Sequence, residues 1–182
     1  MSAAYTRLSQ STYNDWQVIA DATRARQNGV ADRVLGLLAS LGSVTDGFPV
    51  TQLDHALQTA ARAVAADADE ETVVAGLCHD IGKAISVSGH GGIAAAILRP
   101  YVREDLAWVI SVHEHYQGAH YYRHIGLDPG LRTQYEQHPA HSLALQFADD
   151  WDEPAFDPTA RVPGLDSYEA AVRSVFARPR RS

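Results

Sequence analysis

The sequence of 182 residues holds a single cysteine, Cys78, and no long hydrophobic run. One thiol excludes an internal disulfide, and its place inside an apolar segment is typical of a core residue in a reducing compartment. No stretch approaches the ~20 apolar residues of a transmembrane helix. Residues 1–10 are polar and lack the hydrophobic segment of a signal peptide. We therefore expect a cytoplasmic protein with no membrane partner.

Basic residues are also few, because Lys and Arg total 15 against 22 Asp and Glu, for a formal net charge of −7. Proteins that bind nucleic acid present a cationic surface, so this balance argues against nucleic acid as a partner. The C-terminal end carries a small basic tail, which we interpret as a solvated end. The tail consists of Arg173, Arg178, Arg180 and Arg181.

Alternating strand patterns of any length are absent as well, so we predict an all-α fold. The length suits one domain, 1–182, with N-terminal helices in 1–45, a metal-binding core in 46–158 and a C-terminal helix and tail in 159–182. Between 117 and 139 the polar, aromatic and His-rich sequence predicts the irregular wall of a cavity. Helical periodicity and capping residues predict helices over 12–28, 30–41, 51–68, 69–80, 88–98, 102–116, 139–151 and 167–176.

Chemistry is indicated by the run GLCHDIGK at residues 76–83, in which His79 and Asp80 stand at the polar end of a predicted helix. Neighbours in a helix point about 100° apart, so they cannot chelate one ion as a simple pair. They can face one cavity together, and the carboxylate can reach two ions through its two oxygens.

Other histidines strengthen this interpretation, because each falls in or at the edge of an apolar helix, where an unpaired polar group costs free energy. Imidazole and carboxylate are ligands for Fe, Mn or Zn, and four His with two Asp exceed what one ion needs. The set therefore predicts two metal ions. The further histidines are His55, His90 and His113, and the second carboxylate is Asp149 or Asp152 in the late acidic run.

The order of these residues resembles the HD-domain metalloprotein superfamily. QLDHALQTA at 52–60, HDIGK at 79–83 and WD at 151–152 resemble its mixed-valent diiron oxygenases. That branch includes myo-inositol oxygenase and the oxygenases that cleave carbon–phosphorus bonds in hydroxylated aminophosphonates. The resemblance covers residues 48–158 and implies an HD-domain helical bundle. It implies one iron held by His55, His79 and Asp152, a second held by His90 and His113, and Asp80 bridging both.

Several positions depart from the phosphonate enzymes. Gln117 stands where they have a Lys, Asp149 stands where they have an Arg, and Thr45 and Phe48 replace a Tyr and a Glu. Without these cations a phosphonate dianion loses most of its expected partners. Lys83, in contrast, matches a substrate-binding Lys of myo-inositol oxygenase, so the resemblance implies a polyol or hydroxy acid.

We therefore predict an O2-dependent diiron oxygenase that oxidises a small hydroxylated substrate at the hydroxyl-bearing carbon, with two Fe ions in the mixed Fe(II)/Fe(III) state. The candidates for contact with substrate are Lys83 and Gln58, the latter because it shares a helix face with His55. The alternative is a metal-dependent HD-domain phosphohydrolase, since the same ligands serve redox chemistry and hydrolysis. A non-catalytic metal-binding module is the third class.

Overall fold

A computed structural model describes residues 4–177 and 179–180. Within these residues the chain forms eight α-helices joined by short 3-10 turns and one π-helix, and it contains no β-strand. The predicted all-α fold is confirmed. Arg178 and Arg181 of the predicted basic tail lie outside the described residues. No helix in the described part of the chain combines the length and the apolar character needed to cross a membrane.

The α-helices keep the order that the sequence predicts; most of their ends shift by no more than three residues, and two helices differ more. They are α1 (Tyr13–Asn28), α2 (Val30–Ser40), α3 (Gln52–Ala65), α4 (Glu70–Cys78), α5 (His90–Leu98), α6 (Glu104–Tyr121), α7 (His141–Gln146) and α8 (Glu169–Phe176). The 3-10 turns and the π-helix are η1 (Leu8–Gln10), η2 (Leu41–Ser43), η3 (Ile81–Ala84), η4 (Tyr122–Ile125), η5 (Leu131–Tyr135), η6 (Phe147–Asp152) and η7 (Leu165–Tyr168), of which η6 is the π-helix.

Two side chains fix the starts of the helices that lead to the site. Thr51 caps α3, where its hydroxyl accepts a hydrogen bond from the backbone N–H of Asp54 at 3.0 Å and the Asp54 side chain bonds back. Asp69 caps α4 and accepts from the backbone N–H of Thr72 at 2.8 Å. Both caps satisfy N–H groups that a helix end leaves unpaired. They set the rotation of α3 and α4 about their axes.

Two predicted helices differ from the observed ones. The helix predicted over 102–116 continues as α6 to Tyr121, because no Gly–Pro stop signal occurs there and Gly118 packs directly beneath the Tyr122 ring. The helix predicted over 139–151 is split into α7 and the π-helix η6. A π-helix fits one extra residue into the turn and so changes the direction of the side chains after it.

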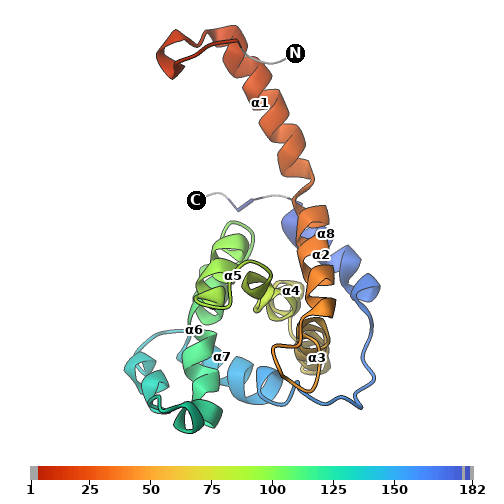
Figure 1. Cartoon of the computed structure of the whole chain (residues 1–182), viewed down its shortest axis with the longest axis vertical. Coiled ribbons are helices and arrows are strands. Elements are labelled where there is room, and N and C mark those ends of the chain that lie inside the picture. Colours follow the sequence, from red (N-terminus) through yellow and green to blue (C-terminus); the bar gives the residue numbers. More distant parts are fainter. Residues whose placement is uncertain (1–3, 178, 181–182) are drawn as a thin grey trace.

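The core lies where α3, α4, α5, α6 and α8 pack together (Figure 1). Of the two N-terminal helices, α2 contributes Val34 and Leu38 to this core. Helix α1 differs, since none of its residues is buried and it extends away from the bundle in Figure 1. The apolar packing of the other helices therefore positions the site.

Candidate metal centre

The six side chains that the sequence predicts as metal ligands converge in the interior from five segments of the chain, since His79 and Asp80 are adjacent. Each of the six is buried, with an exposed fraction of 7% or less. His55 comes from α3, His79 follows the end of α4, Asp80 precedes η3, His90 begins α5, His113 lies in α6 and Asp152 ends η6.

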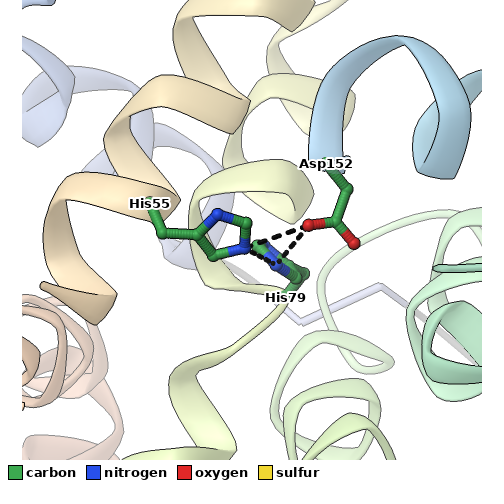
Figure 2. Close-up of side chains that lie close together, drawn as sticks. All are labelled: His55, His79 and Asp152. Atoms are coloured by element: carbon green, nitrogen blue, oxygen red, sulfur yellow. Dashed lines mark hydrogen bonds and ion pairs between the residues drawn. The ribbon is translucent and has the colours of Figure 1, made fainter. Parts of the chain in front are cut away.

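Three of these side chains form the first cluster (Figure 2). Asp152 Oδ1 lies 3.0 Å from His55 Nε2 and 3.4 Å from His79 Nε2, and the two Nε2 atoms are 3.0 Å apart. Asp80 Oδ2 completes the cluster at 3.6 Å from His55 Nε2 and 3.5 Å from His79 Nε2. Two carboxylate oxygens, one from Asp152 and one from Asp80, thus lie within 3.6 Å of the same two imidazole nitrogens.

The other oxygen of Asp80 belongs to a second cluster. Asp80 Oδ1 lies 2.9 Å from His90 Nε2 and 3.5 Å from His113 Nε2, and these two nitrogens are 3.3 Å apart. The Asp80 carboxylate therefore connects two imidazole pairs through its two oxygens, the arrangement of a carboxylate that bridges two ions.

The protonation of the four imidazoles is set by the backbone. Each Nδ1 lies within hydrogen-bond distance of a main-chain carbonyl, which can only accept, so each Nδ1 carries the proton. Each Nε2 therefore faces the cluster and, in the neutral imidazole, presents a lone pair there. Two such lone pairs cannot bond one another unless a metal ion or a proton lies between them. The carbonyl partners are Ala155 for His55 (3.1 Å), Gly76 for His79 (2.7 Å), Val87 for His90 (2.9 Å) and Ile110 for His113 (2.7 Å).

The electrostatics of the clusters also favour a cation. Burial by itself would raise the pKa of Asp80, but the charge of His79, the hydrogen bonds from His113 and His90 and the charge of Lys83 hold it well below its usual value. Burial would lower the pKa of His55, but its bond to Asp152 and the nearby carboxylates raise it. Asp152 Oδ2 is buried and has no hydrogen-bond partner among the described residues, and the buried Asp80 Oδ1 lies against the Nε2 atoms of His90 and His113. This donor set fits two divalent metal ions.

Close backbone contact brings the second cluster together. A Cβ added at Gly82 would overlap the main chain of His90, and one added at Gly91 would lie 3.1 Å from His113 Cε1. Only glycine at these positions lets η3, α5 and α6 approach so closely. Close packing therefore explains why glycine occupies positions 82 and 91.

The late carboxylate of the cluster is Asp152, as we preferred over Asp149. Asp149 is half-buried outside the cluster, where its Oδ1 lies 2.8 Å from Arg132 Nη1 and 2.8 Å from His120 Nε2. Asp150 is exposed. Gln117 donates to Asp152 Oδ1 at 3.0 Å and so orients that carboxylate.

Lys83, the only lysine of the chain, lies at the edge of the clusters. Its ammonium donates to Asp80 Oδ2 at 2.7 Å and to Gln52 Oε1 at 2.9 Å. Gln52 is fully buried, and its role was not foreseen from the sequence. The signal was present, since Gln52 and His55 are three residues apart in α3 and share a face.

Gln58, predicted as a contact for substrate, bonds a neighbouring loop instead. Its amide donates to the carbonyl of Asp157 at 2.9 Å, and its Oε1 accepts from the backbone N–H of Asp157 at 3.1 Å. The adjoining Phe156 stacks on the His55 ring with centroids 4.2 Å apart. Gln58 therefore holds the segment that covers His55, and it lines a different groove from Lys83.

A cavity of about 310 Å³ opens beside the clusters. From the segment 117–139, which the sequence predicts as a cavity wall, Gln117, His120 and Tyr121 line it. Sequence reasoning missed three lining residues, which carry no motif of their own. The full lining is Phe48, Lys83, His90, Glu114, Gln117, His120, Tyr121, Glu153 and Phe156, of which Glu114, Glu153 and Phe156 were missed.

An all-α bundle that buries four histidines and two aspartates defines a metal-dependent enzyme class. The family model described as HD domain matches residues 53–153, more than half of the chain, and this range contains all six residues. The protein belongs to the HD domain family, whose members include metal-dependent hydrolases and oxygenases. No curated protein matches the chain.

Proposed function

We propose that this protein is an O2-dependent diiron oxygenase that acts on a small hydroxylated substrate. The observation that carries the proposal is the Asp80 carboxylate, whose two oxygens face two separate pairs of imidazole Nε2 atoms. In this proposal Asp80 bridges two ions. The ligands of one iron are His55, His79 and Asp152, and those of the other are His90 and His113.

The chain's own residues prepare the site. Main-chain carbonyls hold the protons on the four Nδ1 atoms, so every Nε2 is ready to bind metal. Phe156 covers the His55 ring and limits the access of water from that side. Lys83, held by Asp80 and Gln52, is placed to donate a hydrogen bond to a substrate oxygen in the cavity. The two irons, when bound, would supply the redox chemistry with O2 at the hydroxyl-bearing carbon.

The charges around the cavity favour an oxygenase over a phosphohydrolase. A phosphate ester needs cationic partners, preferably arginine. Among the lining residues Lys83 is the one Lys or Arg, and its charge is already matched by Asp80, while Glu114 and Glu153 add negative charge. The phosphohydrolase is the second candidate, favoured by Lys83 and His120, the two lining groups able to neutralise a phosphate.

The test is to produce the protein with iron under anaerobic conditions, count the bound metals and record an EPR spectrum. We expect two irons per chain, the spin-coupled signal of an Fe(II)/Fe(III) pair and O2 consumption with some members of a panel of hydroxylated small molecules. Asp150→Ala, which removes an exposed acidic side chain of the same late run, should leave the metal count and the EPR spectrum unchanged. A protein that retains only Mn or Mg and hydrolyses a generic aryl phosphate without O2 uptake would overturn the proposal.

A further inference from the structure

The cavity beside the candidate metal centre has an excess of negative charge. Glu114 and Glu153 line it, and neither carboxylate forms an ion pair with Lys or Arg among the described residues. The one lining ammonium, Lys83, lies 2.7 Å from Asp80 Oδ2. The lining His120 lies 2.8 Å from Asp149 Oδ1. Glu114 Oε1 accepts a hydrogen bond from the backbone N–H of Gly91 at 3.4 Å and lies 3.5 Å from His90 Nδ1. Lys83 and His120 thus have carboxylate partners already, whereas the two glutamates have no Lys or Arg partner in the described chain.

Aromatic rings form another part of the wall. Phe48 and Phe156 stack with their centroids 5.2 Å apart, and Tyr121 lines the same cavity. Phe48 already attracts a cation, since Lys83 Nζ lies 5.7 Å from the centre of its ring. Aromatic faces together with carboxylates bind ammonium groups, particularly alkylated ones, through cation–π attraction. Phe156 is stacked on both the His55 ring and Phe48, so the exposed rings of the wall are Phe48 and Tyr121. These two rings and the two glutamates are the features that recognise an organic cation.

The floor of the cavity shows that it is more than a surface group of acidic residues. His90 and Gln117 line the cavity, and they reach Asp80 Oδ1 at 2.9 Å and Asp152 Oδ1 at 3.0 Å. Asp152 Oδ2 is a buried oxygen without a hydrogen-bond partner in the described chain. A molecule in the cavity can therefore place one end at the metal centre and the other among the rings and glutamates.

We propose that the substrate is an amino alcohol, with a hydroxyl directed to the metal centre and an ammonium group bound by Glu114, Glu153, Phe48 and Tyr121. The proposal rests on the function proposed above, because it assigns the substrate class of the same site. It predicts selection by charge, since an anionic substrate of equal size would meet two glutamates. The specificity-determining residues are then Glu114 and Glu153.

A matched pair of probes isolates the charge. Choline and 3,3-dimethylbutan-1-ol have the same shape, but only choline carries a positive nitrogen. We expect isothermal titration calorimetry on the iron-loaded protein, kept anaerobic, to show choline binding about tenfold more tightly than the neutral alcohol. Equal affinity, tighter binding of the neutral alcohol or no binding of either probe would overturn the proposal.

Variants then assign the preference to residues. Glu114→Gln and Glu153→Gln keep the size of the side chain and remove its charge, and each should reduce the choline preference severalfold, while affinity for the neutral alcohol stays the same. Glu104→Gln is the control, because Glu104 is exposed on the same helix as Glu114 and lies outside the cavity. Circular dichroism melts of all variants check that each is folded. An unchanged preference in the folded double variant would contradict the assignment.

The two proposals fail in different ways. If the protein carries two irons and consumes O2 but does not prefer choline to its neutral counterpart, the substrate class is wrong and the oxygenase stands. If choline is preferred, and the glutamate variants lose the preference, while the metal count and EPR spectrum exclude an iron pair, the substrate class stands and the oxygenase falls. Calorimetry and EPR are independent, so neither outcome is ambiguous.

Discussion

The two clusters of the candidate metal centre, called its two halves below, differ in how completely the protein encloses them. One half has three donors besides Asp80, and these three side chains are 0–1% exposed. The other half has only His90 and His113 besides Asp80, and His90 lines the cavity. A metal site that keeps positions free of protein ligands is typical of catalysis, whereas a filled one is typical of structure. External ligands should therefore bind at the His90 half.

The largest expected effect comes from the residue that the two halves share. Asp80→Ala removes an oxygen from both clusters, so we expect the loss of both metal ions, measured by elemental analysis of the protein after desalting. The variant without metal should also melt at a lower temperature than the metal-bound wild type, because a metal ion whose free concentration is 100 times its Kd stabilises the folded state by about 2.7 kcal/mol. Retention of two metals by Asp80→Ala would show that the halves do not share this ligand.

A smaller effect is expected from the enclosed half alone. Asp152→Ala should lose one metal and keep the other, because only the first cluster contains Asp152. Asp149→Ala is the matched control and should keep both, since Asp149 bonds Arg132 outside the two clusters. Elemental analysis of the two variants decides between them. The reverse result would mean that Asp149 is the late ligand.

The open half can be disturbed through the backbone. A methyl group at Gly82 overlaps the main chain of His90, so Gly82→Ala should displace the start of α5 and destabilise the fold by about 1–3 kcal/mol in urea unfolding. Gly36→Ala is the control, because nothing lies within 4 Å of its added Cβ in α2. It should instead stabilise by roughly 0.5–1 kcal/mol. Equal effects of the two substitutions would contradict the close contact.

The smallest effect is expected from Asp69, the side chain that caps the N-terminus of α4. Asp69→Ala should lower the free energy of unfolding at pH 7 by about 1 kcal/mol. Although burial opposes it, hydrogen bonds from Thr72 and the charge of Arg103 lower the pKa of Asp69 in the folded state. A lowered pKa contributes stability above the unfolded value of about 3.9 and loses it as the pH falls through the folded value. The difference between wild type and variant should therefore shrink below pH ~4, and a constant difference would argue against it.

The sequence predicted the all-α fold and the meeting of the six side chains well, because both depend on strong local signals. The capping residues Thr51 and Asp69 mark the starts of α3 and α4, and helical spacing then sets the faces that carry His55 and His79. Choosing Asp152 over Asp149 relied on the resemblance. In the structure the π-helix η6 gives the physical reason, since it turns Asp152 inward. Their role as metal ligands remains a proposal.

The parts that sequence could not give depend on contacts between distant segments. Gln58 shares a helix face with His55, but whether it meets the cavity or the 157 loop is decided by where that loop returns, 99 residues later. Glu114 and Glu153 carry no motif, and only the packing of α6 against η6 brings them to one cavity. The extension of α6 to Tyr121 was not predicted because the segment from 117 is polar and contains Gly118, a residue that often ends a helix; in the structure Gly118 instead packs against the Tyr122 ring.

The position of Lys83 has a practical consequence. It is the only side-chain amine in a chain whose other basic side chains are 14 arginines and the histidines. Its side chain is 13% exposed and lies in the cavity. Reagents that acylate lysine therefore have one internal target, and protection of this amine would report directly on whether the cavity is filled, without knowledge of the reaction.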